Sequence, residues 1–152
     1  MKILKYIGAG LLLILVVMQF INRSEKIAEP VTDNDIAIVL QLDEEVSDLL
    51  TSSCYDCHSN QPKYPWYANV APVSWILADH VEEGREELNF SEWGNYPAER
   101  QDHKLEEILE EVGEGKMPLE AYLDLHAEAE ITPEKLALFK TWVDQERAKL
   151  KK

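Results

Sequence analysis

The chain has 152 residues, a formal net charge of −14 and two cysteines. Residues 1–29 carry a charge of +2, so the remainder carries −16. A surface this acidic excludes nucleic acid as a partner, because phosphate binding requires clustered lysine and arginine. It favours solubility and an electrostatic encounter with a basic partner protein. The length predicts a single folded domain behind an N-terminal leader.

The leader is predicted over residues 1–22. Lys2 and Lys5 precede an apolar run at residues 6–21, which is the order of a basic n-region followed by a hydrophobic h-region. The run is slightly short for a relaxed membrane helix and slightly long for a cleavable signal, and no small-residue cleavage site follows it. We expect a signal anchor, with a cleaved signal peptide as the alternative. Lys2 and Lys5 should stay inside, so the rest of the chain is exported.

Residues 23–34 are polar and are expected to form a tether, and residues 35–152 are expected to form the domain. Apolar residues in the domain recur at three- and four-residue steps without a strand pattern, which predicts an all-α fold. Helices should begin after Asp43, Pro72 and Thr132, because these residue types cap or start helices.

Further helical stretches are expected at residues 105–112, ended by Gly113, and around residues 119–126. The helix after Pro72 should bury one stripe, formed by Val73, Ile76, Leu77, His80, Val81, Gly84 and Leu88. Residues 59–67 and 89–97 are rich in aromatic residues and turn formers, so both are expected to be loops.

Cys54, Cys57 and His58 form the motif C-x-x-C-H, which is the attachment signal for c-type haem. Two thiols three residues apart lie on one face of a helical turn and can reach two vinyl groups of one porphyrin. His58 can then offer its imidazole to the iron. A thioredoxin-like redox pair, a zinc site completed by distant histidines, and a structural disulfide are the alternatives.

Met117 is the best candidate for a second axial ligand. It follows Gly113 and Gly115 and precedes Pro118, which predicts a helix end and then an extended loop that can lay a thioether against a ring. The alternatives are an ordinary core methionine at this position, with His80 or His126 as the ligand. Trp75 and Arg85 are candidates for contact with a haem propionate.

Three segments, CYDCHSNQPKYPWYANVAPVSW, HVEEGREELNFSEW and GKMPLEAYLDLH, resemble the haem-binding domain family. These are exported bacterial proteins similar to small c-type cytochromes, and the resemblance covers about residues 40–143. It implies an all-helical, cytochrome c-like fold around one covalent haem. Cys54 and Cys57 would be the thioether positions, His58 the proximal ligand and Met117 the distal one.

The function expected from these features is electron transfer by a His/Met-ligated haem c, without catalysis. The resemblance places the protein in a bacterial envelope: anchored in the inner membrane with the haem domain in the periplasm, or free in the periplasm if the leader is cleaved. A redox partner protein, with a basic docking surface, is expected. A peroxidase-like enzyme that uses His80 and a sensor whose ligand displaces Met117 are the competing hypotheses.

Overall fold

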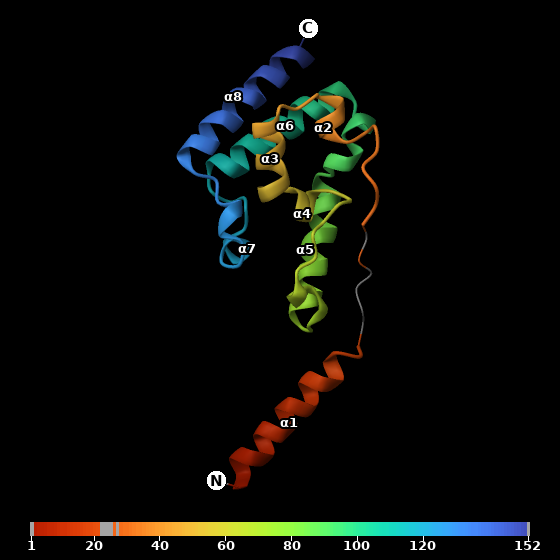
Figure 1. The fold of residues 1–152 in the computed structure, drawn as a ribbon, viewed down its shortest axis with the longest axis vertical. Helices are drawn as coiled ribbons and strands as arrows, with labels where there is room; N and C mark the ends of the chain where they lie inside the picture. The colour runs from red at the N-terminus through yellow and green to blue at the C-terminus, as the bar shows by residue number, and fades with distance from the viewer. Residues whose placement is uncertain (1, 22–25, 27, 152) are drawn as a thin grey trace.

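The computed structural model describes residues 2–21, 26 and 28–151. The chain in these ranges forms α- and 3-10 helices without a β-strand, which confirms the all-α prediction (Figure 1). The predicted tether falls partly on residues 23–25 and 27, which lie outside the described residues. In chain order the elements are α1 (Lys2–Met18), α2 (Ile36–Val39), α3 (Glu44–Ser53), α4 (Tyr55–His58), η1 (Trp66–Asn69), α5 (Val73–Glu87), η2 (Phe90–Asn95), α6 (Ala98–Gly113), α7 (Glu120–Leu123), η3 (Ala127–Ala129) and α8 (Pro133–Leu150).

Helix α1 carries the apolar run and projects from one end of the domain (Figure 1). Its 17 residues rise about 26 Å at 1.5 Å per residue, short of the roughly 30 Å of hydrocarbon in a bilayer. None of the helices among the described residues is both long enough and apolar enough to cross a membrane. The membrane-spanning anchor predicted for residues 1–22 is therefore not found.

The core lies where α2, α3, η2, α6 and α8 meet. Its largest fully buried side chains are Trp93, Phe90, Phe139, Ile36, Leu50 and Leu105. Helices α3 and α8 each turn an apolar face into this core, where Leu50 and Val143 are completely buried. An ion pair at the surface adds to the α6–α8 contact, since Arg147 Nε donates to Asp102 Oδ1 at 2.7 Å.

Side-chain caps explain where two of these helices begin. The Asp43 carboxylate accepts a hydrogen bond from the backbone N–H of Val46 at 2.9 Å, and α3 starts at Glu44, directly after Asp43. The Thr132 hydroxyl accepts one from Lys135, with Pro133 at the first helical position of α8. The predicted starts after Asp43, Pro72 and Thr132 are all confirmed.

Two expectations from the sequence are wrong: the burial of the α5 stripe and the loop at residues 89–97. In α5 the only fully buried residue is Val81, whereas Val73 and Ile76 are 42% and 53% exposed. This face of the helix borders an open cleft rather than another helix. Residues 89–97 are not a simple loop, because Phe90–Asn95 forms η2 and places Trp93 at the centre of the core.

Candidate functional site

The C-x-x-C-H motif forms a single helical turn at the end of α3. Cys54 lies between α3 and α4, and its carbonyl accepts hydrogen bonds from the N–H groups of Cys57 at 3.2 Å and His58 at 3.0 Å. The turn therefore brings both sulfurs to one side, as the spacing predicts. Both cysteines are half-buried free thiols.

The His58 ring is held by two backbone carbonyls of the facing helix. Its Nδ1 lies 2.8 Å from the oxygen of Gly84 and 3.1 Å from that of Leu88, so Nδ1 carries the proton and donates. Both hydrogen bonds of the ring use Nδ1, which leaves Nε2 with a lone pair for a metal. Burial lowers the pKa of His58, and this favours the neutral imidazole that metals bind.

Gly84 allows α5 to approach the motif this closely. A Cβ atom at this position would lie 2.9 Å from the carbonyl oxygen of Cys57 and 3.3 Å from its Cβ. The contact with backbone leaves no room for a side chain. The same residue thus supplies the carbonyl that orients His58 and the space that lets α4 pack against α5.

A cleft in two halves opens beside the motif. The halves have volumes of about 390 and 580 Å³ and share six wall residues, which are Ser53, Cys54, His58, Glu87, Met117 and Pro118. The α6 half is also lined by Phe90, Lys104, Glu107, Ile108 and Glu111. The α5 half is also lined by Val73, Ile76, Leu77, His80 and Tyr122.

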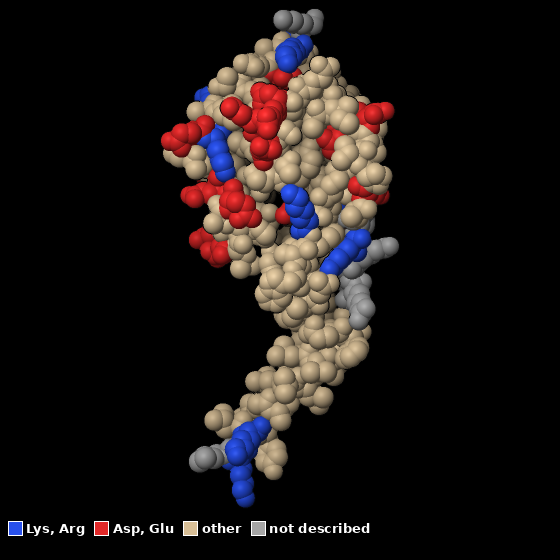
Figure 2. Space-filling model, in the orientation of Figure 1, with Lys and Arg blue, Asp and Glu red and all other residues tan. Residues whose placement is uncertain are grey.

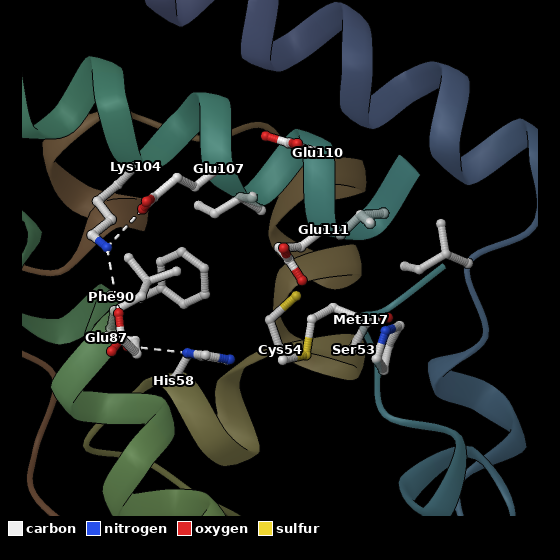
Figure 3. Close-up of a pocket in the computed structure, with 15 residues that line it drawn as sticks. Ser53, Cys54, His58, Glu87, Phe90, Lys104, Glu107, Glu110, Glu111 and Met117 are labelled. Atoms are coloured by element: carbon white, nitrogen blue, oxygen red, sulfur yellow. Dashed lines mark hydrogen bonds and ion pairs between the residues drawn. The ribbon is translucent and has the colours of Figure 1, made fainter. Parts of the chain in front are cut away.

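Met117 reaches this cleft from the end of α6. Gly115 has a φ of +71°, and the N–H groups of Lys116 and Met117 bond to the carbonyl of Glu111 at 2.9 and 3.2 Å. This arrangement turns the chain back and packs Met117 against the core. Figure 3 shows Met117, Cys54 and His58 facing the same hollow. The structure thus brings together all four predicted site residues, Cys57 included, around one cleft.

A cluster of polar contacts that sequence reasoning missed ties the segment after Met117 to the motif. Tyr122 donates to the Asp56 carboxylate at 2.8 Å, and Asp56 lies between the two cysteines. The Tyr122 ring stacks on His126 with centroids 4.3 Å apart, and His126 Nε2 lies 2.6 Å from the Tyr67 hydroxyl. His126 is therefore a structural partner in this cluster, and it does not line the cleft.

The other predicted candidates lie in different places. His80 lines the α5 half of the cleft. Trp75 and Arg85 line neither half, and Arg85 Nε instead donates to the carbonyl of Ser59 at 2.7 Å. Of the Lys and Arg side chains in the described part of the chain, Lys104 is the one that lines this cleft, where it pairs with Glu107 at 2.7 Å.

Burial raises the pKa of Cys54 to about 12 and that of Cys57 to about 11. Both sulfurs are therefore protonated in the folded chain at neutral pH and are poor nucleophiles. At Cys57 burial outweighs Arg85, which lowers the pKa, so the setting of these half-buried thiols differs from the electropositive one of a reactive redox cysteine. This argues against the thioredoxin-like alternative.

Residues 13–145 match a family model described as a haem-binding domain. The chain belongs to the haem-binding domain family. No curated protein and no solved structure matches it. Among the residues that the structure describes, no group of three or more His, Cys, Asp and Glu side chains is placed to hold a metal ion, so the zinc alternative finds no ligand set there.

The residues present in this haem-binding domain fit a haem. The cleft is mostly apolar where Phe90, Ile108 and Leu77 line it, which suits a porphyrin face. A neutral imidazole and a thioether also line it, and these are ligands that haem iron takes. The two cysteine thiols lie on the turn that precedes the imidazole.

Proposed function

We propose that this haem-binding protein is an electron carrier of the c-type cytochrome kind. In this proposal one haem is bonded to Cys54 and Cys57, and its iron is held between His58 and Met117. The observation that carries the proposal is the orientation of His58: the residue lies on the turn that bears both thiols, and its Nδ1 is fixed by the carbonyls of Gly84 and Leu88 on the facing helix. The all-helical packing around that turn supports a fold like that of the small c-type cytochromes.

The covalent attachment follows from the chemistry of the thiols. Each S–H adds across a vinyl group, so a carbon–sulfur bond forms and the hydrogen goes to the neighbouring carbon without any oxidant. Because burial keeps both sulfurs protonated in the folded chain, we infer that attachment precedes closure of α5 over the turn. Gly84 packs directly on Cys57, and this contact completes that closure.

The side chains around the cleft would then position the haem and set its potential. A haem bound here supplies an iron that cycles between two oxidation states. The hydrogen bonds from Nδ1–H to backbone carbonyls would make the His58 imidazole a stronger electron-pair donor to the iron. Met117 as the other ligand would raise the reduction potential relative to a second histidine. Lys104 is 14% exposed and would pair with a haem propionate amid the carboxylates of Glu107 and Glu111.

The competing enzymatic function would use His80, which lines the α5 half of the cleft. A peroxidase needs an open iron position, and a thioether from Met117 would fill it. A sensor would need a small ligand to displace Met117. We propose a carrier rather than an enzyme, because Met117 lines both halves of the cleft beside His58.

We also propose that α1 attaches the domain to a membrane outside the cytoplasm. Its apolar side chains are uncovered along the whole helix, as Leu12 and Leu13 show at 64% exposure each. Acidic side chains gather over the domain on the face that Figure 2 shows, which suits a redox partner with a basic docking surface.

A spectrum of the purified protein before and after reduction tests the central claim. Expression beside c-type maturation machinery should give low-spin bands in the reduced protein and a weak sulfur-to-iron band in the oxidised protein. The colour should stay with the polypeptide after acid–acetone extraction. A colourless extracted chain would refute covalent attachment, and a high-spin oxidised spectrum would refute ligation by Met117. A Lys104→Gln variant should keep the low-spin bands but shift the potential, since one propionate partner is lost.

A further inference from the structure

We propose that the surface formed by Trp66, Val70, Val73 and Ile76, here called the η1 patch, docks on the lipid bilayer to which α1 attaches. The four side chains are 78%, 41%, 42% and 53% exposed, which is unusual for large apolar groups in so acidic a chain. Trp66 lies on η1, Val70 directly follows η1, and Val73 and Ile76 lie on the first turn of α5. The proposal rests on membrane attachment through α1 and goes beyond it, because it assigns a face of the folded domain to the lipid.

The contact between α1 and the patch fixes which face meets the lipid. The Gln19 side chain makes two hydrogen bonds to the backbone of Ala71. Its NH2 group donates to the Ala71 carbonyl at 3.1 Å, and its amide oxygen accepts from the Ala71 N–H at 2.9 Å. Ala71 lies between Val70 and the start of α5. Phe20, which follows α1 and is 79% exposed, is therefore held close in the chain to the residue that joins α1 to the η1 patch.

The distribution of charge points to a lipid surface rather than to a basic protein. Residues 57–78 contain no Asp or Glu, although the chain has 29 of them. Lys26 lies beside the patch, with its Nζ 2.5 Å from Asn69 Oδ1, and Lys63 is exposed on the loop before η1. The first carboxylate after the patch is that of Asp79, which is exposed one turn after Ile76 on α5. Lysines above an apolar surface suit anionic headgroups, and exposed tryptophan suits the membrane interface.

This orientation has a consequence for the haem site. Val73 and Ile76 belong to the η1 patch and also line the α5 half of the cleft. The rim of that half therefore faces the membrane, whereas the α6 half, with its glutamates, faces away from the patch. Figure 2 shows uncharged residues directly next to α1, Lys or Arg side chains just beyond them, and acidic side chains over the rest of the domain.

Thiol labelling on vesicles tests the docking directly. Val70→Cys reports the patch, and Val39→Cys is a matched control because Val39 is 37% exposed on α2, at the other end of the domain (Figure 1). The full chain is bound to vesicles of phosphatidylcholine and phosphatidylglycerol in equal amounts, and a water-soluble maleimide that adds mass is applied. The chain without either substitution is labelled in parallel, so that any reaction of the native cysteines is known. Labelling in urea gives the intrinsic rate of each introduced cysteine.

The proposal expects Val39→Cys to be labelled several-fold faster than Val70→Cys on vesicles, with equal rates in urea. Equal rates on vesicles, with the protein floating together with the lipid, would overturn the docking but leave attachment through α1 intact. Failure of the chain to float would refute that attachment and the docking with it. Protection of Val70→Cys that instead grows with protein concentration in detergent micelles would assign the patch to a second copy of the chain and overturn the lipid assignment.

Discussion

Replacing Gly84 with alanine should weaken the contact that holds the haem motif. The added Cβ would lie 2.9 Å from the Cys57 carbonyl oxygen and 3.3 Å from its carbon, and backbone atoms cannot rotate away. Overpacking of this kind costs about 1–3 kcal/mol. Alanine also gains about 1 kcal/mol over glycine within a helix, which offsets part of that cost.

Gly113→Ala is the matched control, because this glycine ends α6 and has nothing within 4 Å of an added Cβ. Each variant receives a helix-propensity gain, which is smaller at the helix end, so most of that gain cancels and the difference between the variants reports mainly the steric cost. Urea unfolding followed by circular dichroism should place Gly84→Ala below Gly113→Ala by about 1–3 kcal/mol. The His58 hydrogen bond to Gly84 should also lengthen and shift the reduction potential in that variant alone. Equal stability and equal potential in the two variants would refute the packing argument.

Three further outcomes are expected. Met117→Ala should open the iron to added imidazole or carbon monoxide, and Met117→Leu should do the same despite its similar volume; unchanged ligand binding in both would contradict ligation by the thioether. Tyr122→Phe should lower the unfolding free energy by about 1–2 kcal/mol, because the Asp56 carboxylate loses a donor; a neutral result would show that this hydrogen bond does not hold the segment after Met117. The hydrogen bond from Arg147 holds the pKa of Asp102 below its ordinary 3.8, so the unfolded chain binds the proton more readily. The stability that this pair contributes is present above pH 3.8 and is lost as the pH falls through the folded value, and acid titrations of Asp102→Asn should lack that loss.

The helix starts could be predicted because their signals are local. Asp43 and Thr132 cap within three residues of themselves, and Gly115 takes a positive φ just after the helix that it was expected to end. The motif at Cys54 is equally local, since one helical turn presents both sulfurs. Such features depend on backbone geometry over a few residues, so the residue types at those positions are enough to predict them.

The features that depend on distant segments could not be predicted. Nothing near His58 indicates that its ring is held by carbonyls of Gly84 and Leu88, because any residue supplies a carbonyl. The α5 stripe was expected to be buried, since an apolar helix face looks the same whether it meets protein, cofactor or lipid. The sequence pattern suggests Arg85 as a contact for a haem propionate and gives no sign of Lys104, because helical periodicity does not say which cation faces the cleft.

The position of α5 connects these observations. Near its C-terminal end, Gly84 supplies both the carbonyl that orients His58 and the space for Cys57. Its N-terminal end begins beside Ala71, which Gln19 joins to α1. Gly84 lies eleven positions after Val73 in the helix, which is about 16 Å of rise. A displacement of α1 that is transmitted through Ala71 would therefore act on the helix that sets the imidazole, so attachment to lipid and the reduction potential should be coupled through α5.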